Sequence, residues 1–514
     1  MDKVTERVKV GHLSGVVAIV VGLIAVSNQS LWIDEANSAI KAIAPTFSAF
    51  ADEMGSDRGS DLQMPLYMLM LWGWEKIFGR SEFALRAMNI PLFVIALILA
   101  VRCWHTSNSQ RVFFVVFASS SAFLWAYLDE ARPYILQFLG ATACTIALGN
   151  VSGNSTSPRK SDIVLLASGV LILCGSSLLG VIFSFWFSAA FLVLWLMREP
   201  LGCILRRPDT RLAITVCLPA LLALAVYYLW TLSLDAGASS VGSTNLKSIA
   251  FGAYELLGAS GLGPGRVELR SSPMALLPFI APVVAYIFLL ILFLGAGTTL
   301  ALRGNNSTSE RKSAIIFWIA PAAMASTAVL VGLAGDFRIV GRHLTPLLPF
   351  GLILFSLAAG ALWHIRLRMA GRAITILAIL AMLGSALSYR TVDRHAKDDY
   401  RSAAALALET VNEGGTVWWA ADRSAAQFYG LKTIVPDGVA SVEACEGSAC
   451  MANSRNAQYL AILPRPSLVI LSKVDVYDPK GHLQQWLAEN KFTLKGKSSA
   501  FDFFHIAQEC IDLN

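Results

Sequence analysis

The sequence predicts a polytopic α-helical membrane protein, with about eleven transmembrane helices followed by a C-terminal soluble α/β domain. Of its 514 residues, 55% are hydrophobic and only 15% are charged, and the mean hydropathy is +0.58. A soluble globular protein carries a much larger charged fraction. Long apolar stretches recur up to about residue 390, after which the composition becomes that of a soluble domain.

Eleven apolar stretches are long enough to cross a bilayer whose hydrocarbon core is about 30 Å thick. They lie at 11–28, 83–101, 112–128, 134–150, 163–179, 181–197, 212–231, 275–302, 313–334, 344–363 and 371–389. The first follows a basic start and is longer than the apolar part of a cleaved signal peptide, so we expect it to be retained as a helix.

Basic residues between these stretches predict the topology. Clusters of Lys and Arg occur at 3–9, 102–111, 159–160, 198–211, 303–312 and 366–372. The positive-inside rule places each cluster on the cytoplasmic side, so an even number of crossings must separate one cluster from the next. We therefore expect a cytoplasmic N-terminus and an external C-terminal domain.

The same parity rule decides two ambiguous stretches. Residues 65–78 are apolar but too short to span, and a crossing there would move every later basic cluster outside. We expect a helix lying at the outer membrane surface. The run at 163–197 has basic residues on both flanks, so it is expected to form two spans with a turn at GSSLLG.

The chain is thus predicted to have two domains. Residues 1–390 form the transmembrane module, with external loops at 30–82 and 232–274, and residues 391–514 form the α/β domain. In the latter, GTVWWAA and SLVILSK alternate as strands do, and helical patterns occur near 400–412, 423–430 and 480–489. The two tryptophans of GTVWWAA are expected in the core.

Charge and cysteine usage exclude other classes. A formal net charge of +6 is small for this length and is explained by topology, so it does not indicate nucleic-acid binding. The 8 cysteines show no metal-ligand spacing. Only Cys445 and Cys450 lie close together in a polar segment, which suggests a disulfide for which Cys510 is a competitor.

Charged residues concentrate in the loops that this topology places outside. They are Asp34 and Glu35 after the first span, Asp129, Glu130 and Arg132 in 128–134, and Arg338 and Arg342 in 335–343. A carboxylate can accept a proton from an attacking hydroxyl, and arginines bind phosphate in a bidentate fork. Gathered at one membrane face, these groups suit a reaction on a phosphate-bearing substrate. The alternative is that they are solvated charges at helix ends.

Four motifs occur in order along the membrane part of the chain. They are LWIDEANSA at 31–39, QMPLYMLMLWGWEKIFGRSEFALRAMNIP at 63–91, LDEARPYILQFL at 128–139 and RHLTPLLP at 342–349. This ordered set resembles the membrane glycosyltransferases of the GT-C class, in particular the protein O-mannosyltransferases and the aminoarabinose transferases that modify lipid A. The resemblance implies transfer of a sugar from a polyprenyl-phosphate donor at the outer face of the bacterial inner membrane.

The resemblance also implies roles for single residues. Asp34 lies at the position of the catalytic acidic residue and is expected to be the general base of an inverting displacement; Glu35 is the second candidate or an orienting partner. Cations must stabilise the leaving phosphate, and the candidates are Arg132, Arg342, Arg86 and Lys76. Further substrate contacts are expected from Gln63, Tyr67, Glu130, Tyr134 and His343. Snorkelling arginines and an interfacial aromatic belt are the alternative interpretations.

One departure from the family pattern concerns metal binding. Many relatives have His or Gln followed by two prolines where this chain has Gln63-Met64-Pro65, and Gln is a poor substitute for a histidine ligand. We expect that no cofactor is required, although Glu35 with Glu130 could hold a divalent ion.

The acceptor is not specified by any motif. A hydroxyl of lipid A, of lipopolysaccharide or of another envelope glycan is favoured over a protein, and the sugar could be a hexose or a pentose. We expect specificity to lie in residues 232–274, where GLGPGRVELR is a candidate lid, and in the C-terminal domain. The alternatives of another class are a secondary transporter, which would place charges in mid-membrane, and a non-catalytic scaffold.

Overall fold

The computed structural model describes residues 2–57, 59–153, 157–234, 242–303, 308–335, 337–364, 368–498 and 500–506. The chain divides into two compact units. The first comprises Met1–Ser27, Pro45–Gly79 and Phe83–His395, and the second comprises Asn28–Ala44, Arg80–Glu82 and Ala396–Asn514. Asn28–Ala44, from the first predicted external loop, therefore groups with the C-terminal part of the chain.

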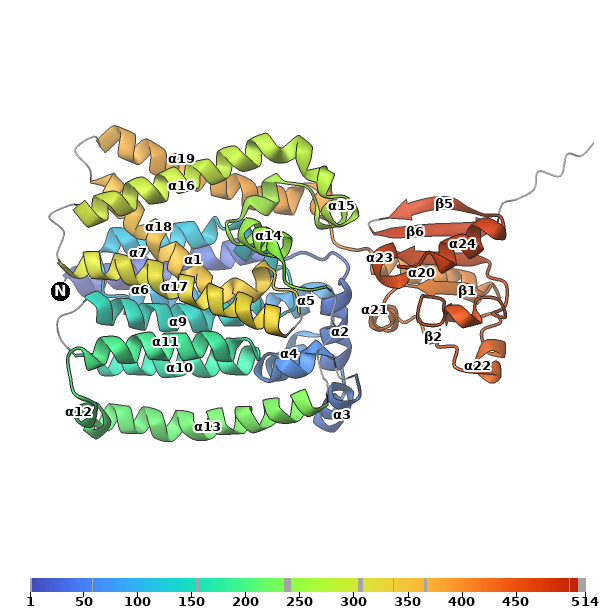
Figure 1. Ribbon diagram of the computed structural model, residues 1–514, viewed down its shortest axis with the longest axis horizontal. Coiled ribbons are helices and arrows are strands. Elements are labelled where there is room, and N and C mark those ends of the chain that lie inside the picture. Colours follow the sequence, from blue (N-terminus) through green and yellow to red (C-terminus); the bar gives the residue numbers. More distant parts are fainter. Residues whose placement is uncertain are drawn as a thin grey trace, which may run out of the picture. The chain divides into compact units, whose positions relative to one another are not determined.

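The first unit is a bundle whose long helices lie roughly side by side (Figure 1). Helices occupy most of each of the eleven stretches predicted to span the membrane, and the stretch at 112–128 is divided between α7 and α8. The helices are α1 (Asp2–Ala25), α6 (Asn89–Cys103), α7 (Asn108–Ser119), α8 (Ala122–Leu128), α9 (Tyr134–Gly153), α10 (Lys160–Ser176), α11 (Gly180–Leu196), α13 (Pro208–Ser233), α16 (Ile280–Arg303), α17 (Thr308–Ala334), α18 (Leu348–Trp363) and α19 (Arg368–Thr391).

Within the part of the chain that the structure describes, seven helices are long and apolar enough to cross a membrane, some together with a short helix that continues into them. The pair α7 and α8, bent by 59°, is an eighth candidate. Ser121 caps α8 at this break, since its Oγ accepts a hydrogen bond from Leu124 N (3.4 Å). α1 and α11 have shorter apolar segments, and α10 has 17 residues. The polytopic helical fold is thus confirmed, with eight candidates that meet the length test among the eleven predicted spans.

Three of the predicted basic loops meet at one end of the bundle. Arg159 Nη1 lies 3.2 Å from His105 Nε2, and Arg207 Nη2 donates to Pro158 O (2.9 Å). The N-terminus and α12 (Leu201–Arg206) lie at this end (Figure 1). The loops that follow α6, α9 and α11 therefore share one face, as the parity of the crossings predicts.

Short helices form much of the opposite end of the bundle, which we call the distal end. α3, α4, α14 and α15 lie there (Figure 1). The short helices of this unit, apart from α12, are α3 (Phe47–Asp57), η1 (Ser60–Gln63), α4 (Pro65–Phe78), α5 (Glu82–Ala87), α14 (Leu246–Leu256), η2 (Ala259–Leu262), α15 (Arg266–Ser271), η3 (Pro273–Phe279), η4 (Gly341–Leu347) and η5 (Asp393–His395).

Helix α4 has the bounds that the sequence predicts for a helix too short to span. Pro65 occupies its first turn, where a missing N–H costs nothing. Gly79 ends it with a φ of +84°, a conformation that side chains with a Cβ rarely adopt. The following helix, α5, then leads into the span formed with α6.

The second unit contains a six-stranded sheet of order β2-β3-β1-β4-β6-β5. The first four strands in this order run parallel to one another. Strand β6 runs antiparallel to β4, and β5 runs antiparallel to β6. The strands are β1 (Val417–Ala420), β2 (Thr433–Ile434), β3 (Ala449–Met451), β4 (Leu468–Ser472), β5 (Phe492–Ser498) and β6 (Phe501–Ile506). The helices are α2 (Ile33–Ala42), α20 (Tyr400–Asn412), α21 (Arg423–Phe428), α22 (Val439–Glu443), η6 (Ala457–Tyr459), α23 (Val474–Tyr477) and α24 (His482–Glu489). Both predicted strands and all three predicted helices of the α/β domain are present.

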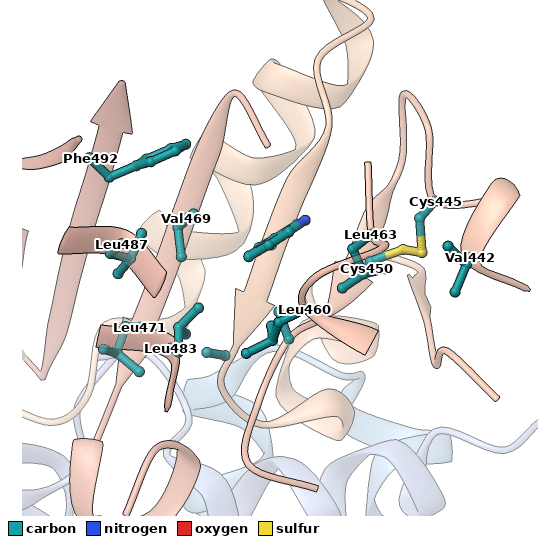
Figure 2. Close-up of a cluster of buried hydrophobic side chains, with 13 residues drawn as sticks. Val442, Cys445, Cys450, Leu460, Leu463, Val469, Leu471, Leu483, Leu487 and Phe492 are labelled. Atoms are coloured by element: carbon teal, nitrogen blue, oxygen red, sulfur yellow. A yellow bond between two sulfur atoms is a disulfide. The ribbon is translucent and has the colours of Figure 1, made fainter. Parts of the chain in front are cut away.

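Two adjacent tryptophans of β1 build the core on the two faces of this sheet. Trp418 and Trp419 are both fully buried, as expected. Trp418 packs against Trp486 of α24, with ring centroids 4.2 Å apart, and belongs to the cluster that includes Leu471 and Leu483 (Figure 2). Trp419 faces Phe501 of β6 on the other side. Successive residues of a strand point to opposite faces, so both layers are fixed from one strand.

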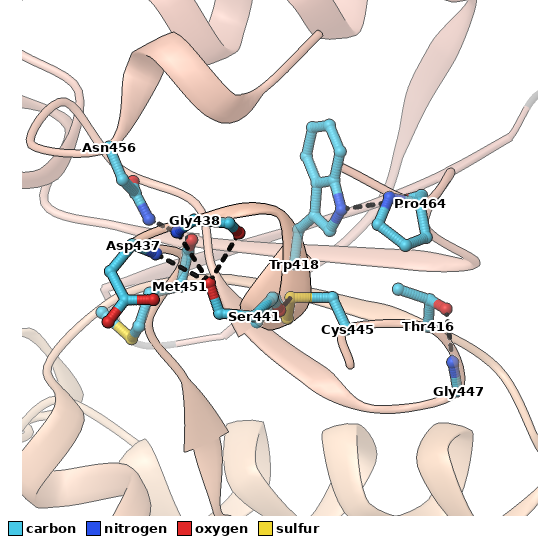
Figure 3. Close-up of a disulfide and its surroundings, with 11 residues drawn as sticks. Thr416, Trp418, Asp437, Gly438, Ser441, Cys445, Gly447, Met451, Asn456 and Pro464 are labelled. Carbon is cyan, nitrogen blue, oxygen red and sulfur yellow. Dashed lines mark hydrogen bonds between the residues drawn. A yellow bond between two sulfur atoms is a disulfide. The ribbon is translucent and has the colours of Figure 1, made fainter. Parts of the chain in front are cut away.

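A disulfide joins Cys445 and Cys450 at the edge of this core (Figure 3). Both cysteines are fully buried, and the bond closes the turn between α22 and β3. The same turn is held by Gly447 N, which donates to Thr416 Oγ1 (2.9 Å; Figure 3). Cys510 lies outside the described residues.

Replacing both cysteines by serine, Cys445→Ser with Cys450→Ser, should lower the stability of this domain by about 2 kcal/mol, because the unfolded chain regains the freedom of the closed loop. Hydrogen exchange of α22 and β3 in the full-length protein measures the change. Cys203→Ser, at an exposed free cysteine of α12, is the control. Equal exchange in both variants would contradict this role of the disulfide.

Candidate active site

Asp34 and Glu35 lie in the first turn of α2, where carboxylates favourably oppose the helix dipole. The two neighbours have different surroundings. Glu35 is fully buried and accepts from Lys397 Nζ at 2.9 Å within the second unit. Asp34 is only partly buried. Of the two carboxylates, Asp34 is thus the one that a substrate can reach more easily.

The pairing of Glu35 bears on the metal question. A carboxylate held by an ammonium group at 2.9 Å is already neutralised and is a poor ligand for a further cation. Among the residues that the structure describes, no three His, Cys, Asp or Glu side chains are grouped as ligands for an ion. Glu35 is therefore already paired with a cationic side chain in this structure.

Arg86 occupies a closed network at the ends of α1 and α8. Its side chain is fully buried, with Nη1 donating to Ser27 O (3.1 Å) and Nε 3.8 Å from Asp129 Oδ1. Ser27 Oγ in turn donates to Asp129 Oδ2 (2.8 Å). These contacts join three loops of the bundle, so Arg86 serves the packing of the distal end. Lys76, by contrast, is exposed on α4 beside Glu75.

Arg132 is engaged by an acidic residue that the sequence did not single out. Its Nη1 lies 2.7 Å from Asp61 Oδ1, and both side chains are almost fully buried. Asp61 belongs to η1, which is held in place by Leu178 N donating to Gln63 O (3.0 Å). Arg132, which was expected to bind the donor phosphate, therefore lies at the distal end, but one edge of its guanidinium faces Asp61.

The two predicted tyrosines are both buried. Tyr67 is 0% and Tyr134 is 5% exposed, so neither offers an open ring face to solvent. Tyr134 packs edge-on against Tyr127 with centroids 4.7 Å apart. Both tyrosines thus pack in the protein interior in this structure.

Arg266 joins two buried carboxylates at the distal end. Its Nη1 donates to Glu130 Oε1 (2.9 Å), and its Nη2 lies 3.4 Å from Glu255 Oε1. The guanidinium also lies over the ring of Tyr127, 5.8 Å from the centroid. Burial raises the pKa of Glu255, and Arg266 opposes that rise. Glu130 Oε2 is buried with no hydrogen-bond partner among the described residues, which leaves an acceptor available.

Glu255 fixes the turn that carries the last predicted pair, Arg342 and His343. Gly341 N donates to Glu255 Oε2 (3.1 Å). A Cβ at Gly341 would come within 2.7 Å of Glu255 Cβ and Oε2, so only glycine permits this approach. The segment that follows, η4, is thereby tied to α14.

Basic residues lie near His343 along the chain and through the packing of η4. Val340 N donates to His343 Nδ1 (3.2 Å), which leaves Nε2 as the ring nitrogen that can donate. Arg342 precedes His343 in η4, Arg338 lies five residues before it, and η4 packs against α9, which begins two residues after Arg132. We call these four residues the basic cluster. A group of three guanidiniums and an imidazole donor is suited to binding a phosphate.

A narrow cleft lies next to these groups within the first unit. It is small and is lined by Phe251, Tyr254, Glu255, Ser260, Pro264, Arg266, Leu269, Tyr389 and His395. His395 stacks on Tyr389 with ring centroids 4.9 Å apart, and its Nε2 lies 3.1 Å from Gly261 O.

The structure thus brings Glu130, Arg132, Arg342 and His343 together at the distal end, and adds three residues that sequence reasoning missed. These are Asp61, Glu255 and Arg266. The sequence does offer one signal for these three residues, because each is a charged residue in a loop that the predicted topology places on the same face. Arg266, in addition, lies within GLGPGRVELR. The pairing of each with a distant residue is not visible in the sequence.

Known structures with a similar fold support the architecture. ArnT from Cupriavidus metallidurans in the apo state is 11% identical with a TM-score of 0.55, covering 96% of this chain and 97% of that chain. The same protein bound to undecaprenyl phosphate is 12% identical with a TM-score of 0.53, covering 96% and 98%. The mycobacterial arabinofuranosyltransferase AftD matches with 13% identity and a TM-score of 0.46, over 98% of this chain and 40% of that chain. No family model and no curated protein matches the sequence. The predicted GT-C type of fold is confirmed by the ArnT structures.

Asp61→Asn should destabilise the protein by about 3–5 kcal/mol, because it leaves the buried Arg132 guanidinium without its opposite charge. Thermal unfolding of the purified protein in detergent measures the loss. The control is Asp52→Asn at an exposed position of α3. If both variants unfold at the same temperature as the wild type, the ion pair does not stabilise the distal end.

The stability of the protein should depend on pH through His395. Burial lowers the pKa of His395 from its ordinary 6.5 to about 4. Between these values the unfolded chain binds a proton that the folded chain does not, so stability is retained above pH 6.5 and falls as the pH drops towards 4. His395→Gln should remove part of this fall in thermal unfolding, whereas His482→Gln at an exposed site should not.

Proposed function

We propose that this protein is a membrane glycosyltransferase that moves a sugar from a polyprenyl-phosphate donor to a hydroxyl of a cell-envelope acceptor. The observation that carries the proposal is the likeness over nearly the whole chain to ArnT, whose structure was obtained with undecaprenyl phosphate bound. Four sequence motifs of the GT-C class occur in the corresponding order along the same chain.

The basic cluster supports a donor activated by phosphate. Arg342 and His343 lie in η4, Arg338 precedes η4, and Arg132 precedes α9, against which η4 packs, so a phosphate at the distal end would meet this group. The negative charge on the leaving phosphate grows during transfer, and preorganised cations stabilise it most in a partly dry site. A donor of this kind needs no nucleotide.

The proposed step is a single displacement with inversion at the anomeric carbon. Asp34 takes the proton of the acceptor hydroxyl while its oxygen forms the new bond to the anomeric carbon. The bond from that carbon to the phosphate oxygen breaks, and polyprenyl phosphate leaves with the electron pair. Glu35 is the less suitable base, because its carboxylate is already paired with Lys397.

We also propose that the distal end and the α/β domain face the periplasm of a bacterial inner membrane. The basic loops at the other end favour a cytoplasmic N-terminus. The buried disulfide supports the same orientation, since such bonds persist in oxidising compartments. The acceptor is then an envelope glycolipid or glycan such as lipid A or lipopolysaccharide. A protein acceptor is the alternative.

Asp34→Asn should reduce the release of polyprenyl phosphate from labelled polyprenyl-phosphate sugars by about 10²–10⁴, the usual contribution of a general base. The assay uses purified protein with an envelope lipid extract as acceptor source. Glu53→Gln, at an exposed acidic residue of α3, is the matched control.

Three outcomes of this assay have different meanings. A labelled product made by the wild type would identify the acceptor. Full activity of Asp34→Asn together with an inactive Glu35→Gln would move the base to Glu35. Absence of release by the wild type with both hexose and pentose donors would overturn the proposed function.

A further inference from the structure

The sheet of the α/β domain has a topological switch point between β1 and β4. These two strands are parallel neighbours, with Trp418 paired to Val469. The chain leaves β1 towards β2 on one side of the sheet, and it leaves β4 towards β5 and β6 on the other side. Where the connections of adjacent strands diverge in this way, open α/β sheets bind their ligands.

Residues that follow these two strands contact the segment that carries Asp34. Helix α21 begins three residues after β1, packs against α2, and is followed directly by Tyr429. Lys473 comes directly after β4 and has a φ of +41°, unusual for a residue with a side chain. Its ammonium lies 5.8 Å from the ring centroid of Trp32, the residue that precedes α2. Strained backbone of this kind is concentrated at functional sites.

Tyr429 holds the start of this segment by three hydrogen bonds. Its hydroxyl accepts from Leu31 N (2.8 Å) and from Ser30 Oγ (3.1 Å), and it donates to Glu82 Oε1 (3.1 Å). The backbone entering α2 is thereby fixed at Leu31, three residues before Asp34.

Lys397 holds the helix itself. Its Nζ donates to the fully buried Glu35 (2.9 Å), and its backbone N donates to Gln29 Oε1 (3.0 Å). Successive residues of a helix point about 100° apart, so fixing the Glu35 side chain also fixes the direction in which Asp34 points. One lysine therefore clamps both ends of residues 29–35.

We propose that the α/β domain uses its ligand-binding edge to hold the Asp34 segment of its own chain, with Lys397 and Tyr429 as positioning residues. At the place where open α/β sheets offer a crevice to a small molecule, the residues that follow β1 and β4 contact α2 and the residues before it. The domain is then part of the catalytic apparatus and not a separate module for binding the acceptor. The effect of this clamp on catalysis rests on the proposed function, whereas the clamp itself does not.

The test uses Lys397→Met, Lys397→Arg, Glu35→Gln and the double variant that combines Lys397→Met with Glu35→Gln. The control is Lys497→Met. Lys497 also forms an ion pair, with Asp502, but on the exposed surface of the same domain. Hydrogen exchange of the full chain, without substrate, should show exchange of α2 amides about tenfold faster in Lys397→Met, with β1 and β4 unchanged. Lys397→Arg should keep the protection, and Lys497→Met should match the wild type.

In the transfer assay, Lys397→Met should lower kcat about tenfold while KM for the donor stays within about twofold. Because both residues act through one contact, the double variant should lose no more than the more damaged single variant. Unchanged exchange in α2 would overturn the clamp, as would losses that multiply in the double variant. A clamp seen by exchange in a protein without transferase activity would reject the proposed function alone.

Discussion

A charged side chain that leaves water must meet an opposite charge, and this constraint ties the distal loops of the bundle together. Asp61 pairs with Arg132 across 71 residues of sequence, and Glu130 pairs with Arg266 across 136. Each pair joins loops from different helices, so the helices between them cannot shift independently. The shape of the distal end follows from these pairs as much as from the packing of the apolar helices.

The same pairs determine which groups remain for chemistry. Arg86 and Arg132 each face an aspartate, so part of their positive charge is already compensated within the protein. Glu255 instead accepts from the backbone of Gly341 and thereby sets the turn from which Arg342 and His343 project. Structural carboxylates thus position a group of cations, and a phosphate is the ligand that such a group is suited to hold.

In the second unit, a buried ion pair has a comparable role. Lys397 lies just before α20 and compensates Glu35 on α2, which is more than three hundred residues earlier in the chain. The hydrophobic core of the sheet is built around Trp418 and Trp419, and this ion pair is not part of it. The pair instead links α2 to the C-terminal residues of the second unit.

The sequence by itself determined the membrane class, the eleven helical stretches, helix α4 and the main strands of the α/β domain. Each of these follows from local hydrophobicity, length and basic flanks, which act over a few turns of chain. The sequence also indicated candidate site residues, namely Asp34, Glu130, Arg132, Arg342 and His343. Only the tertiary structure decided that Glu35 is buried against Lys397 and that Tyr67 is enclosed. It also decided that Asp61, Glu255 and Arg266 form ion pairs at the distal end. Those facts depend on pairs of charges far apart in the chain, and no local pattern records which distant partner a buried charge will meet.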